Sequence, residues 1–198
     1  MSSRNRGFSL VELLVVVVLV TCAYVFMYGP SSSWGQSQRK AQCAQNLQQI
    51  HAALTLYAAE HEGAYPALPG TTTSEPLLSQ LVPLYTTDTA VFVCPGSSHS
   101  ALPGAQPFAE KRCSYAYVMG LKKGSAPDAP LASDGQDGDT SKVTGKPLFS
   151  VSGKAPGNNH RGSGGNLLFV DGHVESWEAL AARDFVLPAG AVLLNPKP

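Results

Sequence analysis

The N-terminal part of the chain has one continuous hydrophobic segment behind a short basic leader. Arg4 and Arg6 precede an apolar run from Phe8 to Tyr28 that contains a single charged residue, Glu12. As an α-helix this run is about 31 Å long at about 1.5 Å per residue. That length matches a bilayer core of about 30 Å. The pattern therefore predicts a membrane-spanning helix.

A second helical pattern follows Gly29-Pro30, where proline is expected to break or kink the first helix because it lacks a backbone N–H. Apolar residues then recur at spacings of three and four along one face, and these are Cys43, Leu47, Ile50, Leu54, Tyr57 and His61. Polar residues occupy the other face, and Gly63 with Pro66 is typical of a helix end. This pattern predicts an amphipathic helix that packs on a sheet of the same subunit.

Short apolar runs between turn residues predict a small β-sheet in the rest of the chain. The predicted strands are Ala90–Cys94, Ser114–Met119, Pro130–Ser133, Asn166–Val170 and His173–Trp177. Asp171-Gly172 predicts a hairpin with a type I′ turn, which needs positive φ at both residues. Short helices are predicted at Pro76–Leu81 and Ala179–Val186. The fold class is therefore α+β, with a long N-terminal helix, half membrane-spanning and half amphipathic, packed on a small antiparallel sheet.

The composition narrows the choice of partners. The 198 residues contain 14 Lys and Arg and 14 Asp and Glu, so the formal net charge is +0, and nucleic acid is not indicated as a partner. Charged residues make up only 14% of the chain, which fits a protein that buries surface in a membrane and against neighbours. The 19 Gly and 15 Pro indicate a loop-rich domain.

The residues around the start of the apolar run resemble a known signal. Gly7-Phe8-Ser9-Leu10-Val11-Glu12 is similar to the N-terminal signal of type IV pilins and type II secretion pseudopilins. The resemblance implies that a prepilin peptidase cuts between Gly7 and Phe8 and methylates the new N-terminus at Phe8. It also implies a pilin-like fold and an assembly role for Glu12, which pairs with the terminal ammonium of a neighbouring subunit.

Three other interpretations of the same segment stay open. A secretory signal peptide needs a small-residue cleavage site, and none follows Tyr28. A lipoprotein signal needs a small residue before the cysteine, whereas Thr21 precedes Cys22. An ordinary single-pass anchor explains the length but not Gly7-Phe8 together with Glu12.

The resemblance implies an organisation in five parts. These are a cleaved leader at 1–7, a transmembrane and assembly helix at 8–28, the amphipathic half of the helix at 29–62, a globular pilin-like domain at 63–187 and a tail at 188–198. The basic leader keeps the N-terminus in the cytoplasm. The expected location is the bacterial inner membrane, with the C-terminal domain extracytoplasmic or in a filament. The expected partners are prepilin peptidase and other pilin-like subunits.

Four cysteines occur in the chain. Cys22 lies in the apolar run and is interpreted as a small apolar filler. Cys94 and Cys113 flank a loop rich in Gly, Pro and Ser, and in an oxidising compartment they are the expected disulfide pair. The alternative is that both are buried free thiols. No four-cysteine metal site is expected, because there is no C-x-x-C motif.

The C-terminal part carries a second resemblance. His160, a Gly-rich spacer and Asp171-Gly172 resemble the C-terminal signature of a pilin-like subgroup, although ten residues separate His160 from Asp171 where nine are usual. Leu131 to Gly135 resembles the strand end that often precedes this motif.

Two metal sites are alternatives to a structural role for this region. His160, Asp171, His173 and Asp134 are of the residue types that bind zinc or copper. Asp134, Asp137 and Asp139 offer carboxylates for Ca²⁺, as in the calcium-stabilised loop of major pseudopilins, but their spacing is not that of an EF-hand. No cofactor is otherwise expected.

The chain contains no G-x-S-x-G, no phosphate-binding loop and no H-E-x-x-H. The predicted function is therefore a non-enzymatic pilin-like subunit that assembles through its N-terminal helix. The alternative is a monomeric, membrane-anchored periplasmic binding protein with a metal or ligand site near His160 and Asp171.

Overall fold

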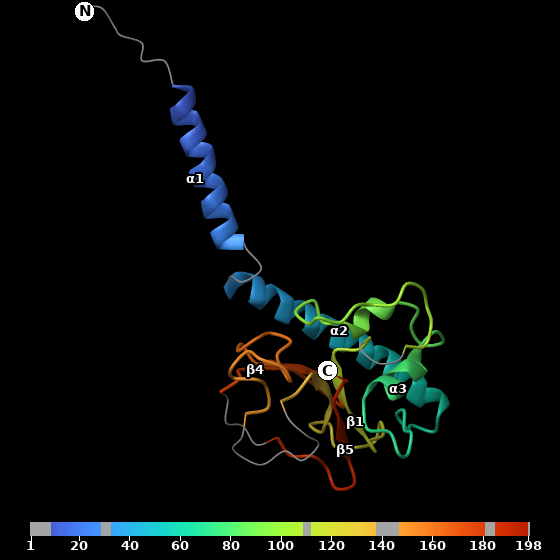
Figure 1. Ribbon diagram of the computed structural model, residues 1–198. Helices are drawn as coiled ribbons and strands as arrows, with labels where there is room; N and C mark the ends of the chain where they lie inside the picture. Colours follow the sequence, from blue (N-terminus) through green and yellow to red (C-terminus); the bar gives the residue numbers. More distant parts are fainter. Residues whose placement is uncertain (1–8, 29–32, 109–111, 138–146, 181–184, 198) are drawn as a thin grey trace, which may run out of the picture. The chain divides into compact units, whose positions relative to one another are not determined.

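The structure is a computed structural model of the chain. It describes residues 9–28, 33–108, 112–137, 147–180 and 185–197 (Figure 1). The chain divides into two compact units, Met1–Gln38 and Arg39–Pro198. The architecture is the predicted α+β, pilin-like arrangement, in which an apolar N-terminal helix is followed by further helices and a five-stranded antiparallel sheet.

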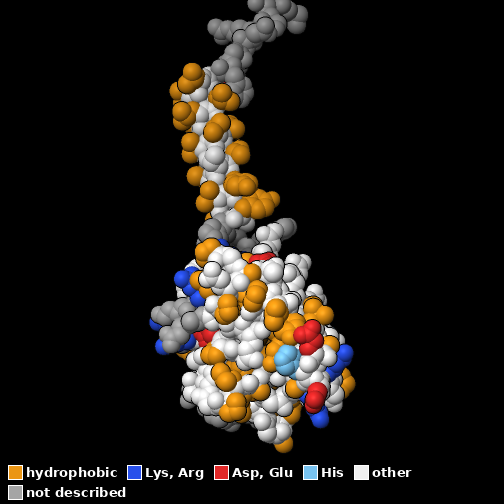
Figure 2. All heavy atoms as spheres, turned by 90° about the vertical axis from the view of Figure 1, so that its right-hand side faces the viewer, with side chains coloured by type: hydrophobic (Ala, Val, Ile, Leu, Met, Phe, Trp, Pro, Cys, Tyr) orange, Lys and Arg blue, Asp and Glu red, His pale blue; other side chains and the backbone are white. Residues whose placement is uncertain are grey.

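The apolar run forms helix α1, Leu10–Tyr28. None of its residues is buried, and hydrophobic side chains line its visible face (Figure 2). Helix α2, Ser33–Glu60, follows. The predicted interruption at Gly29-Pro30 falls on residues 29–32, outside the described residues.

The predicted apolar stripe of α2 is buried over most of its length. The side chains of Cys43, Leu47, Ile50 and Leu54 have no exposed surface. The prediction is wrong for His61, which is exposed. The reason is that α2 ends at Glu60, so His61 no longer follows the helical period. It lies in the closing turn, where Gly63 has a φ of +81° and donates its N–H to the carbonyl of Ala58 at 2.8 Å.

Five strands form one sheet, and their order is β4-β3-β2-β1-β5. Every neighbouring pair is antiparallel. The strands are β1 Tyr115–Met119, β2 Pro130–Asp134, β3 Gly165–Phe169, β4 Val174–Trp177 and β5 Val192–Leu194. The first four match predicted strands, and every boundary agrees within one residue.

The predicted strand at Ala90–Cys94 is wrong. Residues Thr89–Phe92 form a 3₁₀ helix, η2. Asp88 precedes it and accepts a hydrogen bond from the backbone N–H of Ala90 at 2.9 Å. This capping contact favours a helical turn over an extended strand, and only Val93 continues in an extended conformation.

The hairpin between β3 and β4 is present, but its turn is not type I′. Gly172 has a φ of +92°, whereas Asp171 is not among the residues with positive φ. The backbone N–H of Gly172 bonds to Phe169 O, and that of Phe169 bonds to His173 O, both at 3.0 Å. These contacts fit a three-residue loop, a type I turn followed by a left-handed glycine, which is the next commonest way to join two strands.

The predicted short helix at Pro76–Leu81 is confirmed as α3, Glu75–Leu78, and the 3₁₀ helix η1, Ser79–Leu81. The one predicted at Ala179–Val186 falls partly on residues 181–184, outside the described residues.

The segment predicted to be a partly extended tail contributes a strand. β5 pairs with β1, so that Val118 lies opposite Leu193. Three further contacts fix the tail beyond β5. Lys197 N–H donates to Glu75 Oε1 at 2.7 Å. Asn195 accepts from the backbone N–H of Ser74 through its carbonyl at 3.1 Å and from that of Gln136 through its side chain at 3.0 Å.

One hydrophobic core joins α2 to the sheet. It contains the buried stripe of α2 together with residues of β1, β2 and β5, among them Tyr115, Tyr117, Leu131 and Leu193. The amphipathic helix therefore has the intramolecular sheet partner that its pattern predicted. This packing brings Cys43, near the start of the stripe, to the centre of the site described next.

Candidate functional site

The first site candidate is α1 itself. Among the described residues, α1 is the one helix that is long and apolar enough to cross a membrane, and its mean hydropathy is 2.7. Glu12 lies in its first turn and is the charged residue of this helix. The hydroxyl of Thr21 bonds to the carbonyls of Val17 and Val18, so it presents no unmatched polar group to lipid. Gly7 and Phe8 lie outside the described residues.

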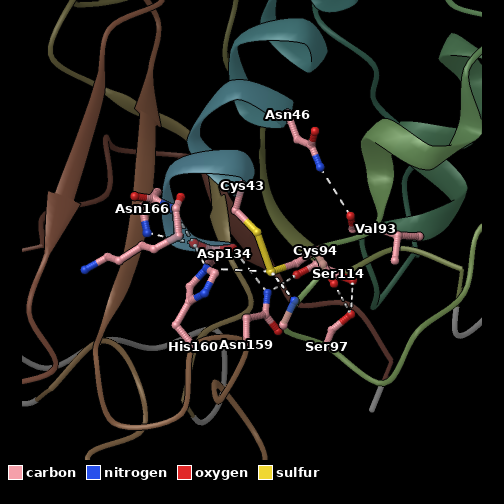
Figure 3. Close-up of a disulfide and its surroundings, with 12 residues drawn as sticks. Cys43, Asn46, Val93, Cys94, Ser97, Ser114, Asp134, Asn159, His160 and Asn166 are labelled. Atoms are coloured by element: carbon pink, nitrogen blue, oxygen red, sulfur yellow. Dashed lines mark hydrogen bonds and ion pairs between the residues drawn. A yellow bond between two sulfur atoms is a disulfide. The ribbon is translucent and has the colours of Figure 1, made fainter. Parts of the chain in front are cut away.

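The second candidate is a buried polar cluster around a disulfide. Cys43 on α2 is bonded to Cys94, which follows η2 (Figure 3). The predicted Cys94–Cys113 disulfide is therefore wrong, and Cys113 is a buried free thiol. The reason is that the apolar stripe of α2 carries Cys43 into the core, where Cys94 also lies.

Asp134, the last residue of β2, is fully buried and surrounded by donors. Its Oδ2 accepts from the backbone N–H of Asn166 at 2.8 Å, from Asn166 Nδ2 at 3.0 Å and from His160 Nε2 at 3.1 Å. Its Oδ1 accepts from Asn159 Nδ2 at 3.3 Å. These bonds compensate for the removal of the carboxylate from water.

His160 is also fully buried and lies between the carboxylate and the disulfide (Figure 3). Its Nε2 is 3.1 Å from Asp134 Oδ2 and 3.6 Å from Cys94 Sγ. Because a carboxylate can only accept, Nε2 carries the hydrogen, and Nδ1 is a buried nitrogen without a partner among the described residues.

The loops around His160 approach each other so closely that they require glycine. A Cβ at Gly96 would lie 1.9 Å from the carbonyl oxygen of Asn159. Asn159 also donates to Ser114 O at 2.8 Å, which ties this loop to the residue before β1. The loop that carries His160 therefore packs against Gly96 and is hydrogen-bonded to Ser114.

Lys40 links α2 to the segment before β3 and to the end of β4. Its Nζ donates to the carbonyls of Ser163 at 2.9 Å and Trp177 at 2.8 Å. Its own carbonyl accepts from Asn166 Nδ2 at 2.9 Å. Burial lowers the pKa of Lys40, and the negative charges of Asp134 and Glu178 partly offset this.

Asp171 and His173 do not join His160. Asp171 lies in the exposed β3–β4 turn, where it pairs with His173. Hydrogen bonds from the backbone and ring of His173 lower the pKa of Asp171. His160 instead contacts Asp134, beside the start of β3. Of the four candidate zinc or copper ligands, the structure brings together His160 and Asp134, and it places Asp171 and His173 in the exposed turn.

The calcium alternative is only partly visible. Asp134 is buried, whereas Asp137 is exposed, and Asp139 lies outside the described residues. A calcium site built on these three carboxylates stays a prediction.

Residues 2–23 match the family model described as the prokaryotic N-terminal methylation motif. The chain carries a type IV pilin-like signal. No curated protein and no solved structure matches the chain. The likeness to the subgroup with the His–spacer–Asp-Gly motif stays a prediction.

Sequence reasoning did not pair Cys43 with Cys94, and it grouped His160 with Asp134 only as two of four candidate metal ligands. One signal was present for the first pair, because Cys43 occupies a core position of the α2 stripe. One was present for the second, because Asp134-Gly135 ends a strand. Neither signal specified the partner.

Proposed function

We propose that this protein is a non-enzymatic pilin-like subunit. A prepilin peptidase processes it, and its N-terminal helix assembles it into a pilus or a type II secretion pseudopilus. The observation that carries the proposal is Glu12, a carboxylate in an apolar helix that lies within the methylation motif at residues 2–23.

The first step of the argument is the energetic cost of Glu12. An ionised side chain costs about 2.5–3.5 kcal/mol at the centre of a bilayer on insertion scales, and Glu12, in the first turn of α1, incurs part of that cost. The remaining residues of α1 are uncharged, so none of them neutralises this carboxylate. A charge of this kind is stabilised by a partner from outside the helix.

The second step is the source of that partner. Cleavage after Gly7 would create an amine at Phe8, about 6 Å from Glu12 along the axis of a continuous helix. An amine on a neighbouring subunit, shifted along an assembly axis, would reach the carboxylate directly. Pairing between subunits would then set their register.

The third step is location. Arg4 and Arg6 precede the apolar segment and favour a cytoplasmic N-terminus. In this arrangement the protein is a single-pass inner-membrane protein with an extracytoplasmic C-terminal domain. A disulfide in the core of that domain suits an oxidising compartment.

The test is Glu12→Ala in the native membrane, with filament recovery and crosslinking measured beside a cleavage assay. The variant should be processed and membrane-embedded, but its assembly should be lost or strongly slowed. Glu12→Asp should be intermediate, because the charge remains but its reach is shorter. Cys22→Ala, an exposed and uncharged position of the same helix, is the matched control and should assemble normally.

Wild-type assembly by Glu12→Ala would refute the pairing argument. That result would favour the monomeric binding protein, which has no need of a carboxylate in its anchor.

A further inference from the structure

Four potential metal ligands meet in the core of the C-terminal unit. Cys43, Cys94, Asp134 and His160 are all fully buried, and their ligand atoms lie within 4.8 Å of one another (Figure 3). They come from α2, from the segment after η2, from the end of β2 and from the loop before β3. We call them the core quartet.

We propose that, when Cys43 and Cys94 are reduced, the core quartet binds one Zn²⁺ ion. The same two sulfur atoms then have two alternative states, a disulfide or a pair of zinc thiolates. The proposal goes beyond assembly through the N-terminal helix and does not depend on it.

The first argument is geometric. In a tetrahedral zinc site with Zn–S of about 2.3 Å and Zn–N of about 2.05 Å, the sulfur and nitrogen ligands are about 3.5 Å apart. The distance from Cys94 Sγ to His160 Nε2 is 3.6 Å. Nitrogen and oxygen ligands of the same site are about 3.4 Å apart, and His160 Nε2 lies 3.1 Å from Asp134 Oδ2. His160 Nε2 is therefore near tetrahedral spacing from both Cys94 Sγ and Asp134 Oδ2, and all four ligand atoms lie within 4.8 Å of one another.

The fourth ligand requires a local movement. The two sulfur atoms of a tetrahedral site are about 3.8 Å apart, so breaking the disulfide must let them separate. The Cα atoms of Cys43 and Cys94 are 5.5 Å apart. With the disulfide broken, rotation about the two Cα–Cβ bonds would let the sulfur atoms move apart.

The second argument is charge. A disulfide is neutral, and two thiolates with Zn²⁺ also sum to zero, so the quartet carries the single charge of Asp134 in either state. Two thiolates without a metal would add two negative charges beside a buried carboxylate, which is strongly unfavourable. The reduced cluster must therefore keep both protons or take up a cation.

The third argument is the support around the ligands. Asn166 donates twice to Asp134 Oδ2, and Asn159 donates to Oδ1. Hydrogen-bonded carboxylates of this kind are typical of metal centres, because the outer contacts fix the orientation of the ligand. On metal binding, His160 would move its hydrogen from Nε2 to Nδ1 and present the Nε2 lone pair to zinc.

The chemistry has two balanced steps. A dithiol reductant transfers two electrons and two protons to the Cys43–Cys94 disulfide, which becomes two thiols while the reductant becomes a disulfide. Zinc then displaces one proton from each thiol, so two protons are released for each ion bound. Because the cluster is fully buried, reduction requires opening of the domain or occurs before the disulfide first forms.

The experiment uses the full chain in detergent micelles. The protein is reduced in denaturant, refolded anaerobically with Zn²⁺ or Co²⁺ and examined by native mass spectrometry. The Co²⁺ form is also examined for thiolate-to-metal absorption. We expect one ion per reduced chain and none on oxidised protein. The proposal is overturned if reduced protein binds neither ion.

Variants assign the ligands. Cys43→Ser with Cys94→Ser should abolish binding, whereas Asp134→Asn and His160→Gln should each weaken it at least about 10-fold. Cys113→Ser, which removes the buried thiol outside the quartet, is the matched control and should bind like the wild type. Loss of binding in Cys113→Ser, or unchanged affinity in both Asp134→Asn and His160→Gln, would overturn the assignment.

Alkylation gives a readout that does not require the variants to fold. In the refolded, reduced wild-type protein, zinc should slow alkylation of Cys43 and Cys94, as mapped by peptide mass spectrometry. A chelator should restore their reactivity. Equal alkylation of both residues with and without zinc would overturn the proposal.

Discussion

Removal of the Cys43–Cys94 disulfide gives a sharp test of the core architecture. The bridge joins residues 51 positions apart. In the chain-entropy model, closing a loop of this length stabilises the folded state by about 4 kcal/mol. The double variant Cys43→Ala, Cys94→Ala should lose about that much free energy of unfolding.

The measurement is equilibrium unfolding by denaturant of the full chain in detergent micelles, with a chelator present to remove metal ions. Because the bridge restricts the unfolded chain, its removal should also steepen the dependence of the unfolding free energy on denaturant. For a chain of this size the loss corresponds to a fall in Tm of about 8–16 °C. Peptide mapping of the wild type should first show one linked peptide that contains Cys43 and Cys94.

The matched control is Cys113→Ala. It also removes a buried sulfur but breaks no crosslink, so it should cost only about 1 kcal/mol. A double variant within about 1 kcal/mol of the wild type would contradict the loop-entropy reasoning. A mapped link between Cys94 and Cys113 would contradict the structure itself.

Three further predictions concern processing, the buried carboxylate and the free thiol. Mature protein should begin at N-methylated Phe8 by mass spectrometry and Gly7→Leu should block cleavage, whereas an intact leader in mature protein would exclude the signal. Asp134→Ala should lower the free energy of unfolding by about 3–5 kcal/mol in denaturant, because it leaves buried donors unpaired. Asp171→Ala, at an exposed ion pair, is the control and should leave the free energy of unfolding unchanged. Similar losses in both variants would show that burial is not the cause. Burial raises the pKa of Cys113 to about 12 from 9.0, so stability should fall as pH rises from about 9 to about 12, and Cys113→Ala should make that fall shallower; an unchanged pH profile would count against this.

Local patterns predicted most of the secondary structure. The apolar run, the α2 stripe and the strands β1 to β4 each depend on neighbours within a few residues, and the structure contains all of them. The failures also have local causes. Asp88 caps the 3₁₀ helix at Thr89–Phe92. The β3–β4 hairpin is closed by a type I turn that ends at Gly172, so Asp171 does not need the positive φ of a type I′ turn.

The buried cluster could not be predicted in the same way. Its members lie far apart in sequence, and the choice between Cys43 and Cys113 as the partner of Cys94 depends on how α2 docks on the sheet. The sequence favoured Cys113, because Cys94 and Cys113 flank one loop rich in Gly, Pro and Ser. The packing of α2 on the sheet instead places Cys43 in the core beside Cys94. Asp134 and His160 meet because Asp134 ends β2 and His160 lies in the loop before β3, the strand that pairs with β2.

The order of the strands also limits how copies of this protein can adhere to one another. The two outer strands are β4 and β5, which are only four and three residues long. β4 carries Glu175, and Pro196 follows β5. Short edges, charge and proline all hinder the addition of a foreign strand. These edges therefore protect the sheet against amyloid-like, edge-to-edge aggregation, and self-association is left to other surfaces of the molecule.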